Sequence, residues 1–254
     1  MKFYGKVKVK KVEFMTEDAF KMVVDRPNDM VIEPGQFFMI KNVELHPLLN
    51  RPISVSSYNE TEIEFGIKIV GTGTENFSKL RVDDEIFLMG ALGNGFDLKK
   101  EYKKVLLVGG GIGVEPLKGA AMELNKMGIF TKMFLGFNNE CFDIDIFKKI
   151  ANEVITFSEA ENKADFIGYP TDILNDELSK SDYDAVFTCG PKILMKKVNE
   201  ISKANNVETQ LLLEERMACG IGACLGCTCE TVNGYKKVCE DGPMFYGNEV
   251  NLNE

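Results

Sequence analysis

Short runs of alternating polar and apolar residues fill the first 98 residues of this 254-residue chain. The runs are rich in β-branched and aromatic residues, and turn sequences such as EPGQ and GTGTEN separate them. They span residues 6–14, 36–40, 53–57, 61–70 and 84–90. Strands this short and this closely spaced predict an antiparallel β-barrel or sandwich.

A different pattern begins near residue 101 and continues to about residue 206. KVLLVGG (104–110) is apolar without interruption, as in a strand that is buried on both faces. Further strand-like runs alternate with amphipathic stretches, and KILMKKVNEISKAN (192–205) has the clearest helical spacing of apolar residues. This alternation predicts an α/β domain with a parallel sheet, which is typical of nucleotide binding.

A last strand-like run, TQLLLEERM (209–217), leads into a stretch that is rich in cysteine and glycine. We therefore predict a multidomain α+β chain of three units. They are an antiparallel β-barrel over residues 1–98, an α/β nucleotide-binding domain over 99–208 and a metal- or cluster-binding subdomain over 209–254.

Charge and composition narrow the possible partners. The formal net charge of −9 disfavours nucleic acid, because phosphate binding needs a concentrated basic surface. The first residues lack the apolar region of a signal peptide, and no run of 18 apolar residues is present, so we expect no membrane partner and a cytoplasmic location. Structural disulfides are rare in the cytoplasm, so clustered cysteines there indicate metal or redox chemistry.

Five of the seven cysteines lie between residues 217 and 243. Cys219, Cys224, Cys227 and Cys239 have the spacing C-x4-C-x2-C-x11-C, and the first three match the plant-type ferredoxin spacing for a 2Fe–2S cluster. The glycines at 220, 222 and 226 permit the left-handed turns that a loop around such a cluster requires. The spacing favours a cluster.

Two alternatives to the cluster remain at this point. C-x2-C pairs are common in structural zinc sites, although zinc more usually takes two separated pairs. The second alternative is that the four thiols bind no metal at all. The fifth cysteine, Cys229, lies two residues beyond Cys227, and we interpret it as a buried small residue.

RPISVSS (51–57) has an arginine-proline pair followed by serine on a predicted strand, which suits flavin binding. Arg51 would neutralise a pyrophosphate and Ser54 would hydrogen-bond the isoalloxazine edge. GTGT (71–74) enters a short predicted helix, whose free N–H groups suit phosphate. Taken singly, the first motif can be a plain strand start and the second a plain turn.

VLLVGGGIGVEPL (105–117) reads as a strand, a glycine turn and a helix start, where the phosphates of a dinucleotide sit. Gly109 and Gly111 fit the dinucleotide fingerprint, but Val114 replaces the third glycine and no acidic residue ends the next strand. An ordinary Rossmann dehydrogenase is therefore disfavoured. FTCGP (187–191) places Cys189 at the carboxyl edge of the sheet, unless it is only a buried strand-end residue.

The order of the motifs RPIS, GTGT, GNGF, GGGIG, CGP and ERMACGIGACLGC with VCEDGP resembles one family. This family is the electron-transfer subunit of class 1B dihydroorotate dehydrogenase, within the ferredoxin-NADP reductase superfamily. The resemblance covers nearly the whole chain, and ERMACGIGAC with KVCEDGP is its most specific part.

The resemblance implies an FAD-binding barrel, an NAD(H)-binding middle domain and a C-terminal 2Fe–2S loop near the contact with a separate FMN-containing catalytic subunit. Electrons would pass between NAD(H) and that partner through FAD and the cluster, while the partner oxidises dihydroorotate to orotate in pyrimidine (UMP) biosynthesis. The expected assembly is a heterotetramer with two copies of each subunit. No catalytic acid–base pair is required, and none is evident.

The resemblance also assigns candidate residues. The flavin candidates are Arg51, Pro52, Ile53, Ser54, Gly66, Ile67, Lys68, Gly73 and Thr74. The nucleotide candidates are Gly109, Gly110, Gly111, Gly113 and Cys189. The cluster ligands are Cys219, Cys224, Cys227 and Cys239.

The chain departs from the family pattern in TFSEAENKADFIGYPTD (156–172), where many members have a stretch like T-D-D-G-S-x-G. Glu159 and Glu161 add negative charge there, which predicts NAD(H) over NADP(H) because the 2′-phosphate would be repelled. The alternative is that the chain has abandoned pyridine nucleotides and exchanges electrons with a ferredoxin or another carrier.

Two other functions compete with this one. The same cofactors serve related subunits whose partners are hydrogenases, sulfide dehydrogenases or bifurcating transhydrogenases. A zinc-stapled binding module without redox activity is the third possibility, and a colourless purified protein would support it.

Overall fold

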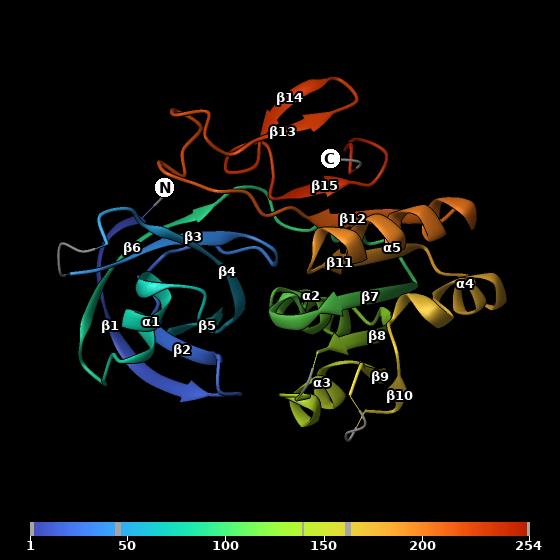
Figure 1. Cartoon of the computed structure of the whole chain (residues 1–254), viewed down its shortest axis with the longest axis horizontal. Coiled ribbons are helices and arrows are strands. Elements are labelled where there is room, and N and C mark those ends of the chain that lie inside the picture. Colours follow the sequence, from blue (N-terminus) through green and yellow to red (C-terminus); the bar gives the residue numbers. More distant parts are fainter. Residues whose placement is uncertain (1–2, 44–46, 139, 161–163, 253–254) are drawn as a thin grey trace.

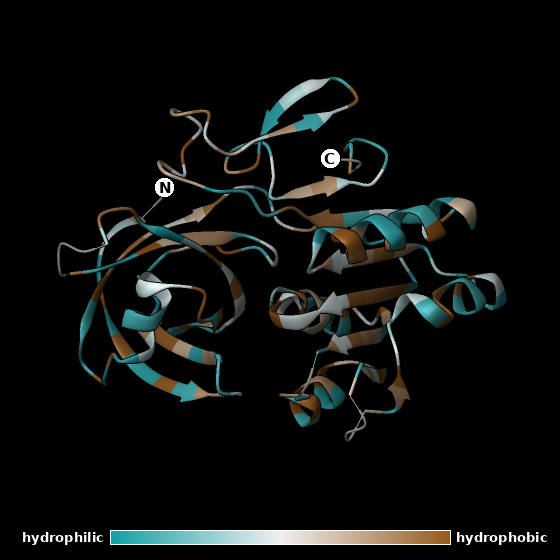
Figure 2. Cartoon of the chain, in the orientation of Figure 1, coloured by the Kyte–Doolittle hydropathy of each residue, from teal (hydrophilic) through white to brown (hydrophobic). Residues whose placement is uncertain are grey.

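The computed structural model describes residues 3–43, 47–138, 140–160 and 164–252. Figure 1 shows a β-barrel beside an α/β layer, with the C-terminal segment lying across the top of both. Figure 2 shows apolar residues concentrated on the barrel strands and the central strands of the sheet. Within the described ranges, no helix is long and apolar enough to cross a membrane.

The N-terminal barrel is closed, with the strand order β1-β2-β5-β4-β3-β6 and antiparallel pairing throughout. This confirms the predicted antiparallel barrel. Its core is aromatic and aliphatic and includes Phe20, Phe38 and Phe65. The elements are β1 (Phe3–Phe14), β2 (Ala19–Asp25), β3 (Phe37–Asn42), β4 (Arg51–Tyr58), β5 (Glu62–Lys68), α1 (Thr72–Ser78) and β6 (Glu85–Leu92).

The middle of the chain forms a seven-stranded sheet in the order β10-β9-β8-β7-β11-β12-β15, parallel except for β15. This confirms the predicted α/β arrangement. The strands are β7 (Lys104–Gly110), β8 (Phe130–Phe137), β9 (Glu153–Ser158), β10 (Phe166–Ile167), β11 (Ala185–Cys189), β12 (Glu208–Leu212) and β15 (Met244–Tyr246). The helices are η1 (Gly111–Val114), α2 (Glu115–Lys126), α3 (Ile144–Ile150), α4 (Thr171–Lys180) and α5 (Lys192–Ala204).

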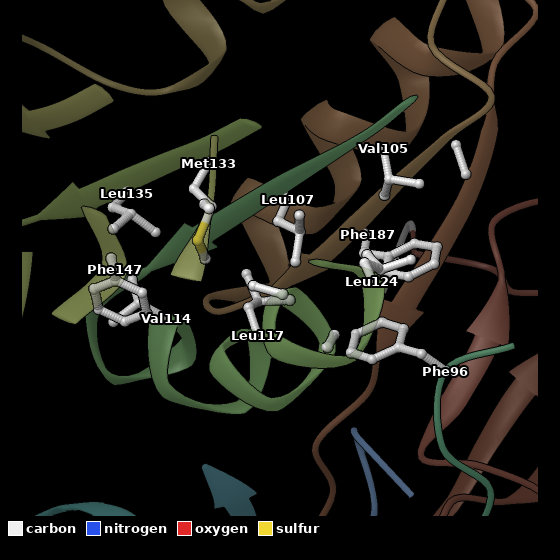
Figure 3. Packing of buried hydrophobic residues seen from close by; sticks show 14 of the residues in the cluster. Phe96, Val105, Leu107, Val114, Leu117, Leu124, Met133, Leu135, Phe147 and Phe187 are labelled. Atoms are coloured by element: carbon white, nitrogen blue, oxygen red, sulfur yellow. The ribbon is translucent and has the colours of Figure 1, made fainter. Parts of the chain in front are cut away.

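The helix α2 lies between the sheet and the barrel. Figure 3 shows Leu117 of α2 facing Leu107 of the sheet, and Leu124 of α2 belongs to the same buried cluster. On its other side, α2 packs so closely against β4 that a Cβ atom added at Gly119 would lie 3.1 Å from the carbonyl oxygen of Ser56. The helix α2 therefore packs against both the sheet and the barrel.

The C-terminal segment joins the two halves. It contains the hairpin β13 (Thr228–Thr231) and β14 (Gly234–Lys237), and it returns to the sheet as β15. One apolar core is shared by the barrel, the sheet and this segment, and it includes Met39 and Leu92 of the barrel, Leu211 of β12, Cys227 and Cys239. The backbone of Asn94, just after the barrel, also donates to the carbonyl oxygen of Gly242 at 2.6 Å.

Candidate functional site

The four predicted cluster ligands come together in the segment between β12 and β15. The thiols of Cys219 and Cys224 are hydrogen-bond neighbours, and so are those of Cys227 and Cys239. Two pairs of sulfurs match the needs of a 2Fe–2S cluster, in which four cysteines are shared between two irons.

Backbone N–H groups point at all four of these sulfurs. Cys219 accepts from Ile221 at 3.5 Å, Cys224 from Gly226 at 3.5 Å and Cys227 from the backbone of Cys239 at 3.4 Å. Cys239 itself accepts from Gly222 at 3.1 Å. Such donors stabilise the negative charge of thiolate ligands, so the loop fits an iron–sulfur cluster.

The sulfurs differ in their surroundings. The N–H of Ile221 lowers the pKa of Cys219 to about 7, so this exposed part of the loop presents a thiolate readily. Burial raises the pKa of Cys239 to about 12, although the N–H of Gly222 opposes this. Cys239 therefore lies on the protein side of the site and Cys219 nearer the solvent.

The loop bends through three left-handed residues: Gly220 (φ 70°), Gly222 (φ 77°) and Leu225 (φ 59°). The predicted left-handed turn at Gly226 is wrong, because Leu225 takes that conformation instead. A left-handed leucine is a strained residue, of a kind that clusters at functional sites. Its side chain is 65% exposed.

The zinc alternative requires several ligands around a single ion. Across the described ranges, no three cysteine, histidine, aspartate or glutamate side chains converge on one point that would hold a single metal ion. The pairing of the four sulfurs matches a binuclear cluster, in which each iron takes two of the cysteines.

Cys229 lies on β13, opposite Lys236 of β14. It is half-buried against the shared C-terminal core. Burial raises the pKa of its thiol, so it is a neutral packing residue.

The cluster loop packs directly on the barrel. A Cβ atom added at Gly220 would lie 2.6 Å from Cγ of Met39 on β3. β3 pairs with β4, where Met39 faces Pro52 and Phe37 faces Ser54. The cluster loop and the predicted flavin strand therefore lie against the same strand, although more than 160 residues separate them in sequence.

The structure brings the two predicted phosphate motifs together. A Cβ atom added at Gly73, in the first turn of α1, would lie 2.1 Å from Nε of Arg51 at the start of β4. The guanidinium also donates to the carbonyl oxygen of Leu49, which fixes its direction. Among the residues that the structure describes, no side chain caps the N-terminus of α1, so its first N–H groups are available beside this cation.

The other flavin candidates lie on β4, α1 and β5. Pro52, Ile53 and Ser54 are half-buried on β4, and Thr74 is buried in α1. Ile67 belongs to the barrel core, so only its backbone can reach a ligand. The remaining two lie at the end of β5: Gly66 packs against Glu115 of α2, and Lys68 forms an exposed ion pair with Asp18 at 3.2 Å.

A cavity of about 380 Å³ opens at the carboxyl ends of the parallel strands, where open α/β sheets bind ligands. Gly110 and Gly111 line it. The other three nucleotide candidates lie behind the cavity wall. Gly109 packs on Val114 and Leu117, and a Cβ atom added at Gly113 would lie 2.7 Å from the carbonyl oxygen of Cys189. Burial raises the pKa of Cys189 to about 12, so its thiol stays neutral.

Several lining residues were not among the named nucleotide candidates, although Pro191 lies in FTCGP (187–191) and four others lie in the divergent stretch 156–172. They are Gly136, Phe137, Asn138, Gly168, Tyr169, Pro170, Thr171, Pro191, Ile193, Leu194 and Lys197. Glu159 also lines the cavity and is hydrogen-bonded to the Tyr169 hydroxyl, which raises the pKa of Tyr169. The divergent stretch at 156–172 is thus part of the cavity wall, while Glu161 lies outside the described residues. The lining residues could have been found from the segments that directly follow the predicted parallel strands, because ligands bind at the carboxyl ends of such strands.

Known proteins match both the sequence and the fold. Residues 214–251 match the family described as the iron-sulfur cluster binding domain of dihydroorotate dehydrogenase B. The electron transfer subunit of dihydroorotate dehydrogenase B (NAD(+)) from Clostridium perfringens is 40% identical over 249 residues, which cover 97% of this chain and 98% of that protein. The subunit of the same name from Clostridium acetobutylicum is 39% identical and covers 88% of each chain.

The solved structures point the same way. A chain of the NADH-dependent reduced ferredoxin-NADP oxidoreductase, described in connection with flavin-based electron bifurcation, superposes with a TM-score of 0.89 and 28% identity over 97% of this chain and 90% of its own. A ferredoxin NADP+ reductase from Neisseria gonorrhoeae with bound FAD and NADP shares the fold, with a TM-score of 0.67 and 16% identity over 84% and 94%. By its near-complete match to these relatives, the chain belongs to the family of electron transfer subunits of dihydroorotate dehydrogenase B.

Proposed function

We propose that this chain carries electrons between NAD(H) and the FMN-containing catalytic subunit of a dihydroorotate dehydrogenase, in pyrimidine biosynthesis. FAD, when bound, exchanges a hydride with the nucleotide and single electrons with the 2Fe–2S cluster. The observation that carries the proposal is the shared strand: the cluster loop packs on Met39 of β3, and β3 pairs with the flavin strand β4. The two redox sites are neighbours for this reason.

The chain's own residues bind and orient these groups. Arg51 and the first turn of α1 present positive charge and N–H groups for the pyrophosphate of FAD. The cavity that Gly110 and Gly111 line presents backbone N–H groups at the sheet edge for the dinucleotide. The buried sulfurs of Cys227 and Cys239 anchor the cluster to the protein, and the remaining two ligands face outward.

The outward side of the cluster loop is apolar. Ile221 is 51% exposed and Leu225 is 65% exposed, on either side of Cys224. We propose that this surface docks the catalytic subunit in an assembly with two copies of each chain, since an electron acceptor must approach the cluster closely. Light scattering on the co-expressed subunits measures the stoichiometry, and a monodisperse monomer that ignores the partner contradicts it.

The three units proposed from sequence serve as the working division: 1–98 for FAD, 99–208 for NAD(H) and 209–254 for the cluster. Strand pairing couples the last two, because β12 and β15 complete the sheet of the middle unit. A cytoplasmic location fits the seven cysteines, all of them free of disulfides.

The proposal is tested by adding NADH anaerobically to the purified chain and following the flavin and cluster absorption. We expect NADH to bleach the flavin first and the cluster afterwards. With the FMN-containing subunit added, dihydroorotate should reduce NAD. If dithionite reduces the cluster but neither NADH nor NADPH bleaches the flavin, the middle domain is not a nucleotide site.

A second redox partner is suggested by the superposition on the NADH-dependent reduced ferredoxin-NADP oxidoreductase chain. The two functions share every internal step and differ only in the partner that exchanges electrons with the cluster. Reduced ferredoxin as electron donor, compared with dihydroorotate plus the FMN subunit, separates them. NAD reduction by ferredoxin alone would replace the first proposal.

Replacing Glu159 by glutamine is expected to improve the use of NADPH relative to NADH. Glu159 lines the cavity, where its charge repels a 2′-phosphate by about 1–2 kcal/mol, or about five- to thirtyfold in affinity. Stopped-flow rates of flavin reduction with both nucleotides measure the ratio. Glu153→Gln, which removes the same charge from the opposite end of β9, is the control and should leave the ratio unchanged.

A further inference from the structure

A group of buried charges lies where α2 meets the barrel. We define the interdomain charge cluster as Lys21 of β2, Glu64 of β5, Glu115 and Lys118 of α2, and Asp143 at the N-terminus of α3. The side chain of Glu115 is 1% exposed and that of Lys118 is 5% exposed. Charges buried this deeply are costly unless each one is paired.

Each cation in the cluster has its own carboxylate. Lys21 donates to both oxygens of Asp143 at 2.8 Å, and Lys118 donates to Glu64 at 2.5 Å. Lys118 is 3.6 Å from Asp143 and 3.8 Å from Oε2 of Glu115, so Glu115 receives no direct bond from either lysine. Three carboxyl groups thus face two ammonium groups, and Glu115 is the unmatched acid.

The contacts of Glu115 suit a neutral carboxylic acid. Its Oε2 lies 2.6 Å from the hydroxyl of Ser56, and its Oε1 has no hydrogen-bond partner in the described part of the chain. An ionised oxygen left unpartnered in a buried site is far more costly than the carbonyl oxygen of a neutral acid. Burial raises the pKa of Glu115, Asp143 and Glu64 raise it further, and Lys118 and the bond from Ser56 oppose this.

The position of Glu115 connects the cluster to the nucleotide cavity. Glu115 is the first residue of α2 and directly follows η1, whose Gly111 lines the cavity. Its side chain fills the space that Gly66 of β5 leaves open, where an added Cβ would lie 2.3 Å from Cγ of Glu115. The carboxyl group is therefore wedged between the barrel and the glycine segment.

We propose that Glu115 is a positioning residue that holds one proton at neutral pH, and that the balanced charge cluster fixes the glycine segment against the FAD barrel. The position of this segment sets how the nucleotide meets the flavin. The bound proton is independent of the proposed function, whereas its effect on hydride transfer rests on it.

The sign of the pH effect follows from the raised pKa. The folded chain keeps a proton on Glu115 that the unfolded chain has already lost near neutral pH, so the stabilisation is full at acid pH and is lost as the pH rises through the raised pKa. Above it, the cluster carries one uncompensated negative charge at the domain contact. Stability should therefore fall as the pH rises toward the raised pKa and level off above it, whereas nucleotide-linked flavin reduction should fall as the pH passes through the raised pKa.

The first test is the infrared spectrum of the FAD-loaded chain at neutral pH. We expect a carbonyl stretching band of a protonated carboxylic acid, which Glu115→Gln removes and Glu123→Gln keeps. Glu123 is on the same helix but pairs with Lys126 outside the cluster. Asp143→Asn should also remove the band, since two carboxylates then balance two lysines with Glu115 ionised. An unchanged band in Glu115→Gln overturns the proton, and a band that persists in Asp143→Asn overturns the charge balance.

The second test compares the pH profiles of thermal unfolding and of flavin reduction by NADH. In the parent and in Glu123→Gln, we expect the folding equilibrium constant to fall with pH relative to Glu115→Gln, by at most about tenfold per pH unit because one proton is involved. The rate of flavin reduction in the parent should fall as the pH passes through the raised pKa of Glu115, and it should stay level in Glu115→Gln.

Identical profiles in the parent and Glu115→Gln overturn the positioning role. A parent that NADH fails to reduce at any pH contradicts the proposed function instead, while the infrared band still decides the proton. Glu115→Gln keeps the shape and the hydroxyl contact of the side chain, so it is the variant most compatible with folding. If it does not fold, Asp143→Asn carries both measurements, and an alkaline fall at the parent's pH would count against the proposal.

Discussion

Replacing Cys219, Cys224, Cys227 or Cys239 with serine is expected to stop electron transfer to the acceptor while flavin reduction by NADH continues. Each of these four sulfurs accepts a hydrogen bond from a backbone N–H group, and the sulfurs lie in two pairs, one for each iron. Each substitution therefore removes one ligand from one iron. The rate to the acceptor should fall by more than about 100-fold, since losing even an outer-shell partner costs 10- to 100-fold. EPR of the dithionite-reduced variants, with iron and sulfide analysis, measures the cluster.

Cys229→Ser is the matched control. This thiol is only ten residues from Cys239 and two from Cys227, but it packs in the C-terminal core and its pKa is raised by burial. The EPR signal and the transfer rate of this variant should match those of the parent. Loss of the signal in Cys229→Ser, together with its retention in Cys239→Ser, would show that the fourth ligand has been assigned to the wrong cysteine.

The cluster loop could be read from sequence because its chemistry is local. Three of its four cysteines fall within nine residues, and the spacing alone limits which sulfurs can share a metal site. The backbone that bends the loop was less predictable. Glycine is the usual residue for left-handed turns, yet Leu225 rather than Gly226 takes that conformation, held by the bond from the Thr228 hydroxyl to its carbonyl oxygen.

The barrel was predicted from five runs of alternation, and β2 was missed. AFKMVVD is buried over nearly its whole length: Phe20, Met22 and Val24 belong to the barrel core, and Lys21 between them is buried in its ion pair with Asp143. The alternation that marks a half-exposed strand is therefore absent. The helix α4 was missed because its first residues fall in the divergent stretch 156–172, which departs from the family pattern. Its amphipathic pattern buries only Leu174 and Leu178.

The contacts between domains lay beyond sequence reasoning. Lys21 and Asp143 are 122 residues apart, and Ser56 and Glu115 are 59 apart, so no periodicity links them. Motifs predicted which segments bind cofactors, and the packing of α2 on the barrel determined how those segments face each other.

Arg51→Ala is expected to weaken FAD binding by about 10- to 150-fold, which corresponds to a charge-assisted contact of about 1.5–3 kcal/mol. The guanidinium lies over Gly73 at the N-terminus of α1, where the described structure shows no side-chain cap. Arg51 therefore places its positive charge directly beside the turn that is suited to phosphate. FAD retention after gel filtration and the dissociation constant from fluorescence measure the loss. Arg81→Ala, which removes an exposed arginine from the same barrel, should retain FAD like the parent.

The close approach at Gly73 supplies a second, independent test of the same contact. A Cβ at this position would lie 2.1 Å from Nε of Arg51, so Gly73→Ala should displace the guanidinium and weaken FAD binding although Arg51 is still present. Residues that act through one contact give non-additive effects. The double variant Arg51→Ala with Gly73→Ala should therefore bind FAD no more weakly than the weaker single variant. Additive losses would mean that Arg51 and the turn act separately, and that the guanidinium only anchors the start of β4 through Leu49.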